Sequence, residues 1–162
     1  MNIFYLDQNP VKAAAYHCDK HCVKMILETA QLLSTAHREL DGNEMADRLG
    51  LYKSTHKNHP SAVWVRQGWF NYQWAFNLFK QLLKQYTARY GKEHKTGRLL
   101  DALATAPANI PSVTIGSPLP PQCMPDEYKR EDGDTVQAYR AYYKGAKAGF
   151  AKWSKSPAPE WW

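Results

Sequence analysis

The apolar positions in the first forty residues follow helical spacing. Asn9-Pro10 is typical of a helix start, Asp19 can cap a second start, and Asp41-Gly42 is typical of a helix end. We therefore expect one broken helix or two successive helices between about Pro10 and Leu40. One side of the second part is apolar and predicted to be buried, and it carries Cys22, Ile26, Leu33 and Ala36.

A longer apolar stripe follows this region. His59-Pro60 opens it, and large apolar residues then recur at alternating spacings of four and three as far as Gly91. A pattern of this length predicts a central helix over residues 60–91, with its aromatic rings in the core rather than in a base-stacking surface. The stripe consists of Val65, Trp69, Tyr72, Phe76, Phe79, Leu83, Tyr86 and Tyr90.

A third helical pattern lies near the C-terminal end. Asp134 and Gln137 have the spacing of a capping box, and apolar residues repeat at helical intervals over residues 136–153. We expect a helix here, followed by a tail in which Trp161 and Trp162 fold back onto the core.

The remaining segments are shorter. A short helix is expected near Arg98 to Thr105, an extended segment at Ile3 to Leu6, and a long ordered loop between Pro107 and Pro125, where Pro, Gly and Ser are frequent. Together the elements predict an all-α fold in which residues 1–162 form a compact single-domain bundle of about three main helices with long ordered loops.

Composition sets the class of protein. The 162 residues are 44% hydrophobic, which is enough to bury one core. The 21 Lys and Arg residues against 15 Asp and Glu give a formal charge of +6, which favours a nucleic-acid partner, although moderately basic small proteins are common. The three cysteines are an odd number and no apolar run reaches signal or membrane length, so we expect a reduced, cytoplasmic protein without a membrane partner.

Candidate catalytic and binding residues lie on the polar side of the first helical region. The side contains one carboxylate, that of Glu28, among imidazole, amine, amide, hydroxyl and guanidinium groups, whereas an ordinary solvated face mixes Lys and Glu. One acid among cations and donors is suited to general acid–base work or to stabilising positive charge, and a plain solvated face is the alternative. The polar positions are His17, His21, Lys24, Glu28, Gln31, Thr35 and Arg38.

The same region raises the question of a metal site. His17 and His21 have the i, i+4 spacing of zinc ligands on a helix. Cys18 and Cys22 lie about 100° around a helix from them, and Cys22 belongs to the apolar side. We therefore expect no metal and no cofactor, and a structural zinc ion is the alternative.

A second basic cluster is the loop "YKSTHKNHP", which precedes the long aromatic stripe. Its cations and hydroxyls lead into a helix N-terminus, an arrangement suited to phosphate contacts. The loop "YGKEHKTGR" is a third basic segment. The residues predicted to contact DNA are His17, His21, Gln31, Arg38, Lys53, His56, Lys57, His59 and Arg66.

Part of this pattern resembles a known family. Asp19-x-His21, Glu28 seven residues after the histidine, and Arg38 ten residues after the glutamate are similar to the first helix of the phage-type pyrimidine dimer DNA glycosylases with lyase activity, often called endonuclease V. The likeness extends more loosely to "NHPSAVWVRQGWFNYQWAF" and to the Tyr-rich "AYRAYYKGAKAGF". It covers most of the chain, but only Asp19, His21 and Glu28 lie at motif-like positions.

The resemblance implies an all-α domain that kinks duplex DNA and extrudes a nucleotide. An amine would attack C1′ of a damaged nucleoside, and β-elimination from the resulting Schiff base would nick the strand. By position, Glu28 would act near the sugar, and His21 and Arg38 would hold DNA. The chemistry of the residues agrees, since a carboxylate stabilises an oxocarbenium-like centre and an amine traps its carbon.

The chain departs from the family at the nucleophile. The family uses the α-amine of a small residue exposed after Met1 is removed, whereas Asn2 is large enough to leave Met1 in place. The nucleophile is then the Met1 α-amine, or Lys24, or the lyase step is absent, in that order of preference.

We therefore expect a DNA glycosylase with AP-lyase activity that acts as a monomer on a damaged or modified pyrimidine in double-stranded DNA. One alternative is a phage-type enzyme that transfers a group to a DNA base. Another is a basic DNA-binding module without catalytic activity.

Overall fold

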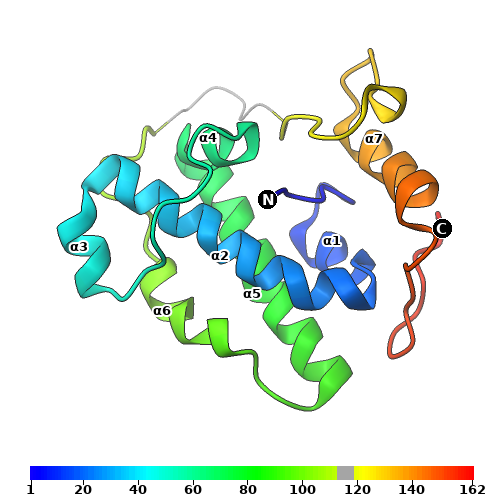
Figure 1. The fold of residues 1–162 in the computed structure, drawn as a ribbon, viewed down its shortest axis with the longest axis horizontal. Coiled ribbons are helices and arrows are strands. Elements are labelled where there is room, and N and C mark those ends of the chain that lie inside the picture. Colours follow the sequence, from blue (N-terminus) through cyan, green and yellow to red (C-terminus); the bar gives the residue numbers. More distant parts are fainter. Residues whose placement is uncertain (113–118) are drawn as a thin grey trace.

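Two long helices form the centre of the molecule. In the computed structural model, which describes residues 1–112 and 119–162, α2 (Asp19–Asp41) packs against α5 (Trp69–Tyr90), and their buried apolar residues belong to one core. Figure 1 shows the two helices crossing. α1 (Pro10–Tyr16) packs on α5, and α4 (Pro60–Arg66) packs on both long helices.

The predicted break in the first helical region is confirmed. His17 and Cys18 separate α1 from α2, and Gly42 ends α2 with a φ of 87°, a backbone conformation that favours glycine. Asp19 lies in the first turn of α2 rather than at its cap. Its carboxylate accepts the N–H and the hydroxyl of Ser154 at 2.9 and 2.6 Å, which ties the C-terminal tail to this helix.

The prediction of one continuous helix over residues 60–91 is wrong near its start. Gln67 and Gly68 separate α4 from α5, and the Trp69 N–H donates to the Pro111 carbonyl at 3.0 Å instead of continuing a helix. Glycine is a poor helix former, which explains the position of the break. Most of the aromatic stripe is nevertheless in the core as predicted, since Tyr72, Phe76, Phe79 and Tyr86 are buried, whereas Trp69 and Tyr90 are exposed.

The C-terminal helix begins as predicted, but helical structure ends at Lys147 instead of continuing to residue 153. α7 (Thr135–Tyr142) begins where the Asp134 carboxylate accepts the Gln137 N–H at 3.0 Å. The tail folds back as expected, with the Trp161 ring edge-on to the Tyr16 ring at a centroid distance of 5.8 Å. The end of α1 and the end of the chain are therefore covered by the same aromatic contacts.

Short elements complete the chain. η1 (Lys95–Leu99) and α6 (Leu100–Leu103) confirm the predicted short helix, and the others are α3 (Asn43–Arg48), η2 (Asp126–Tyr128) and η3 (Tyr143–Lys147). The described residues form helices and no strand, so the all-α prediction is confirmed. The predicted loop between Pro107 and Pro125 falls partly on residues 113–118, outside the described residues. No helix in the described part of the chain is long and apolar enough to cross a membrane.

The first residues run through the core. Residues 3–6 do not form a strand, yet all four are buried, and the Phe4 ring stacks on the His21 ring at 4.4 Å. Figure 1 shows the N-terminal end near the middle of the molecule in this view, with α2, α4 and α7 around it. Burial of this segment determines where Met1 lies.

Candidate active site

The carboxylate of Glu28 lies beside two amines. Its Oε2 is 3.7 Å from the α-amine nitrogen of Met1, and its Oε1 is 3.4 Å from Nζ of Lys24, one turn earlier on α2. Oε2 also accepts the main-chain N–H of Asn2 at 3.2 Å. The structure thus brings together Met1, Lys24 and Glu28, the three residues that the sequence marks as catalytic candidates.

The α-amine of Met1 is held at the surface by a buried side chain. The Met1 side chain is only 4% exposed, but the residue as a whole is partly exposed, so its accessible part is the main chain that carries the amine. The Glu28 side chain is 14% exposed, and that of Lys24 is 63% exposed. The Met1 amine therefore has a fixed position, whereas Lys24 presents its amine on a mobile stem.

Asn2 connects this end of the chain to three other elements. Its side-chain amide donates to the Cys123 carbonyl at 2.9 Å, and its Oδ1 accepts the Tyr139 hydroxyl at 2.9 Å and the Ser61 hydroxyl at 3.4 Å. Sequence reasoning missed Asn2, Ser61, Cys123 and Tyr139. From the sequence, Asn2 matters only because its size keeps Met1 in place. Its hydrogen-bond partners could not be predicted, because they come from segments far apart in the chain.

The charges of the Met1 amine and of Glu28 both act on His59. Burial lowers the pKa of His59, and the positive charges of the N-terminus and His56 lower it further, while the Glu28 carboxylate opposes them. His59 Nδ1 accepts the Ser61 N–H at 3.1 Å, so the neutral ring carries its proton on Nε2. His59 can thus donate a hydrogen bond near the amine without adding a positive charge there.

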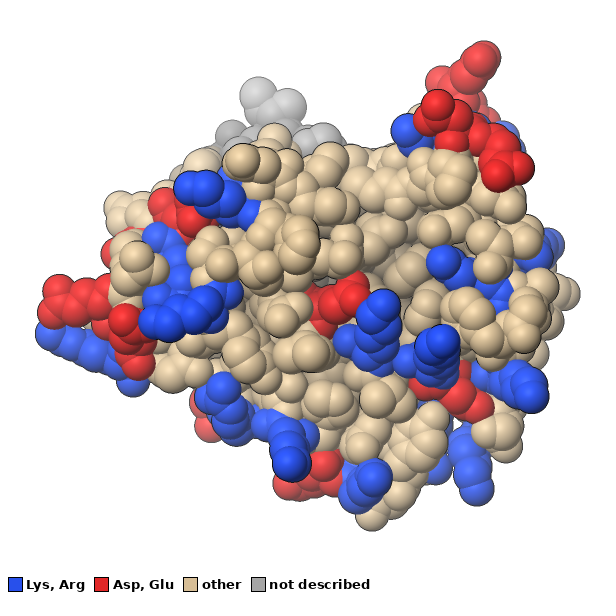
Figure 2. Space-filling model, viewed as in Figure 1, with Lys and Arg blue, Asp and Glu red and all other residues tan. Residues whose placement is uncertain are grey.

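Basic side chains lie around the first turns of α2, the helix that carries Glu28. Lys147, Lys24 and Lys20 all act to lower the pKa of His21, which places them around the first turns of α2. The basic loop that ends at His59 lies nearby as well, since His59 is coupled to the N-terminus. Figure 2 shows a small acidic patch near the middle of this face, with Lys or Arg side chains on one side of it and uncharged side chains on the other. Cations next to a carboxylate are compatible with a polyanionic ligand.

The expectation that His17 and His21 lie on a wet helix face is wrong. Both rings are buried. His17 Nδ1 donates to the Ala13 carbonyl at 2.6 Å, and His21 Nδ1 shares a hydrogen bond of 2.6 Å with the Tyr143 hydroxyl. In this conformation neither ring is available to a DNA phosphate, because the chain turns inward between α1 and α2 and the first residues cover the α2 side.

These buried histidines make stability sensitive to acid. Burial lowers the pKa of His17 to about 4 and that of His21 to about 3, from 6.5. The unfolded chain therefore binds more protons between pH 6.5 and 4, and the free energy of unfolding should decrease as pH falls through this range. We expect a loss of about 4 kcal/mol between pH 7 and pH 5, about 2 kcal/mol for each histidine, measured by urea unfolding. A free energy of unfolding that is constant down to pH 5 would contradict the prediction.

Arg38 is also buried rather than on a wet face. Its guanidinium donates to the Tyr52 carbonyl at 2.6 Å, the Leu51 carbonyl at 3.0 Å and the Asp47 carboxylate at 2.8 Å. Thr35 is buried too, and Gln31 is partly buried. The DNA contact implied for Arg38 is thus replaced by a structural role, and the predicted polar stripe is accessible mainly at Lys24 and Glu28.

The basic loop before α4 is held against α2 and α3 by ion pairs. Lys53 Nζ lies 3.0 Å from the Asp47 carboxylate, and Lys57 Nζ lies 3.5 Å from that of Glu39. Arg66 donates to the Lys57 carbonyl at 2.7 Å. The side chains of Lys53 and Lys57 remain largely exposed despite these pairs, so the predicted phosphate contacts stay possible for this loop.

The cysteines pack inward as predicted. Cys18 and Cys22 are buried, and Cys22 Sγ points to the Leu82 carbonyl at 3.9 Å. Across residues 1–112 and 119–162, no three His, Cys, Asp or Glu side chains are grouped as metal ligands. The candidate site consists instead of an amine, a carboxylate and their hydrogen-bond partners.

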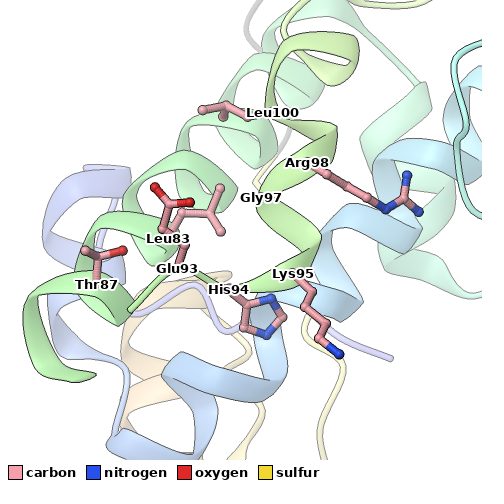
Figure 3. Close-up of a pocket in the computed structure, with 8 residues that line it drawn as sticks. All are labelled: Leu83, Thr87, Glu93, His94, Lys95, Gly97, Arg98 and Leu100. Carbon is pink, nitrogen blue, oxygen red and sulfur yellow. The ribbon is translucent and has the colours of Figure 1, made fainter. Parts of the chain in front are cut away.

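Two open hollows lie elsewhere on the surface. One of about 470 Å³ lies between α5 and η1, and Figure 3 shows Thr87 on one side of it and Lys95 and Arg98 projecting from the other. Another of about 500 Å³ runs along α4 and begins at Asn58 and Pro60, the neighbours of His59. Neither hollow has a lining residue in common with the candidate site, but the second is lined by the two sequence neighbours of His59.

Comparison of the chain with protein-family models, with curated proteins and with solved structures gives no match.

Proposed function

We propose that this protein is a DNA glycosylase with AP-lyase activity that acts on a damaged or modified pyrimidine. The observation that carries the proposal is the Met1 α-amine, fixed 3.7 Å from Oε2 of Glu28, with Nζ of Lys24 at the other oxygen of the same carboxylate. An amine nucleophile and a carboxylate are the two groups that this reaction requires. A simple anchor for the chain end would use the same ion pair, so the distinction needs a chemical test.

The proposed reaction uses both groups. The lone pair of the neutral Met1 amine forms a bond to C1′ as the glycosidic bond breaks. The base leaves with the electron pair of the glycosidic bond and takes up a proton, and the new C1′–amine nitrogen gives up a proton in turn. The Glu28 carboxylate stabilises the positive charge that develops on the sugar. Ring opening gives a Schiff base, loss of the C2′ proton expels the 3′ phosphate, and water then releases the amine.

The Met1 amine is preferred over Lys24 because of its position. The buried Met1 side chain and the buried residues 3–6 hold the α-amine in one place, which lowers the entropic cost of attack. Lys24 is next in order, since its Nζ is 3.4 Å from Oε1 of the same carboxylate. In this scheme Lys24 can also bind a phosphate beside the reacting sugar.

The proposed ligand is double-stranded DNA, bound by a cytoplasmic monomer. Lys20, Lys24 and Lys147 lie around the start of α2, and the loop carrying Lys53 and Lys57 supplies further cations. The hollow that begins beside His59 is where we place the extruded nucleotide. His17, His21 and Arg38 are left out of this surface because they are buried.

The test is covalent trapping. The protein is incubated with duplex DNA that carries an ultraviolet photodimer or an abasic site, in the presence of borohydride, and the cross-linked peptide is identified by mass spectrometry. We expect an adduct on the peptide that contains the Met1 amine. An adduct on Lys24 would move the nucleophile to that residue. The absence of an adduct with both substrates would refute the lyase, and binding without trapping would favour the non-enzymatic module or a transferase.

DNA affinity should depend steeply on salt. If about four phosphates are neutralised, the dissociation constant should rise ~150-fold between 50 and 200 mM salt, because the bound counterions are released. Fluorescence anisotropy with an undamaged duplex measures this directly. An affinity that does not change with salt would argue against every nucleic-acid ligand for this surface.

A further inference from the structure

We infer that Asn2 is the residue that positions the Met1 α-amine against Glu28, an assignment that rests on the proposed function. Asn2 lies between the two groups in the hydrogen-bond network, because its main-chain N–H donates to Oε2 of Glu28 at 3.2 Å. Its side chain is held independently by partners from other elements. Asn2 does not contact the sugar in this scheme and acts only through the Met1 amine and the Glu28 carboxylate.

The Asn2 side chain uses both ends of its amide. Nδ2 donates to the Cys123 carbonyl at 2.9 Å, and Oδ1 accepts the Tyr139 hydroxyl at 2.9 Å and the Ile3 N–H at 2.8 Å. Ser61 adds a longer contact from its hydroxyl at 3.4 Å. A carboxylate lacks the donor and an aliphatic side chain lacks both functions, so asparagine fits this position for a chemical reason.

Fixing Asn2 leaves the amine little freedom. The peptide bond between Met1 and Asn2 is planar, so the position of the Asn2 N–H also fixes the carbonyl carbon and Cα of Met1. Only rotation about the Cα–C bond of Met1 can then move the amine. That rotation would also swing the Met1 side chain, which is buried. The hydrogen bonds of Asn2 and the packing of Met1 together determine the distance from the amine to Glu28.

The variants must keep Met1. A small residue at position 2 would allow Met1 to be removed. With Asn2→Ala or Asn2→Ser, a slower reaction could then come either from a misplaced Met1 amine or from the loss of Met1 itself. Asn2→Leu removes the amide while keeping the branching of the side-chain heavy atoms, and Asn2→Asp keeps the acceptor but adds a negative charge next to the amine. Tyr139→Phe removes one partner of Asn2 and leaves the N-terminal residues unchanged. Intact mass confirms that Met1 is present in each protein.

The experiment measures trapping on abasic duplex DNA at temperatures where all variants are folded. Asn2→Leu should slow trapping about 10-fold with DNA affinity within twofold of wild type, because the amine is less often in position for attack. Tyr139→Phe should have a smaller effect, and adding it to Asn2→Leu should cause no further loss. Asn2→Asp should shift the pH profile of trapping toward higher pH, by about one unit, because a nearby negative charge favours the protonated amine.

A second readout does not depend on DNA chemistry. The pH profile for labelling the Met1 α-amine with an isotopic amine reagent should move in the same direction in Asn2→Asp. If wild type fails to trap, the proposed function is wrong, and the labelling profile of Asn2→Leu, which adds no charge, still decides whether Asn2 positions the amine. A labelling profile and a trapping rate that are both unchanged in Asn2→Leu would overturn the inference, since a purely structural role alters only the unfolding temperature.

Discussion

Replacing Glu28 by Gln is expected to slow borohydride trapping on abasic DNA ~1000-fold. Glutamine keeps the shape of the side chain and an oxygen that can accept the Asn2 N–H. It loses the negative charge that would stabilise the sugar cation and hold the amine, and losses of this size are typical for such groups. The measurement is the single-turnover rate of adduct formation on gels, with DNA affinity determined in parallel.

Glu39→Gln is the matched control for this change. Glu39 is also on α2 and also pairs with a lysine, since its Oε2 lies 3.5 Å from Nζ of Lys57. Its replacement should leave trapping within about threefold of wild type, because Glu39 has no contact with the amine. Equal trapping by the Glu28→Gln protein and wild type would remove Glu28 from the mechanism and leave the ion pair as an anchor of the chain end.

Arg38→Ala should destabilise the fold by about 3 kcal/mol without a specific effect on DNA. The Arg38 side chain is 2% exposed and binds two main-chain carbonyls as well as the side chains of Asn43 and Asp47. Its removal leaves the Leu51 and Tyr52 carbonyls without these donors and creates a cavity. For a chain of this size the midpoint of thermal unfolding should fall by about 6–12 °C.

Arg66→Ala separates this structural role from a DNA contact. Arg66 is only partly buried and donates to a single carbonyl, that of Lys57, in the loop that we predict to bind phosphates. This variant should keep its unfolding midpoint within about 2 °C and weaken DNA binding. If Arg38→Ala instead unfolds like wild type but loses DNA affinity, the role implied by the family resemblance is correct and the structural role is not.

The site depends on a segment whose direction is not apparent from local patterns. Residues 3–6 are a short apolar run, which is compatible with a strand or with any buried segment. In the structure they pack against α2 and place Met1 beside Glu28. The chemistry of the residues predicts that Met1 and Glu28 act together, but the short distance between them follows from long-range packing. Asn2 was missed for the same reason, because its partners belong to α4, α7 and the loop before η2.

The sequence by itself determined the all-α class, the break between α1 and α2, the capping of α7 and the single carboxylate among basic residues, because periodicity, caps and composition are local properties of the chain. It could not determine which polar positions face water. Helical spacing alone places His21, Glu28 and Arg38 on one side of α2, but the tertiary structure covers His21 with Phe4 and Tyr143 and encloses Arg38 within the segment after α3. Only Glu28 remains open beside an amine, because burial depends on what packs against a helix and not on the helix itself.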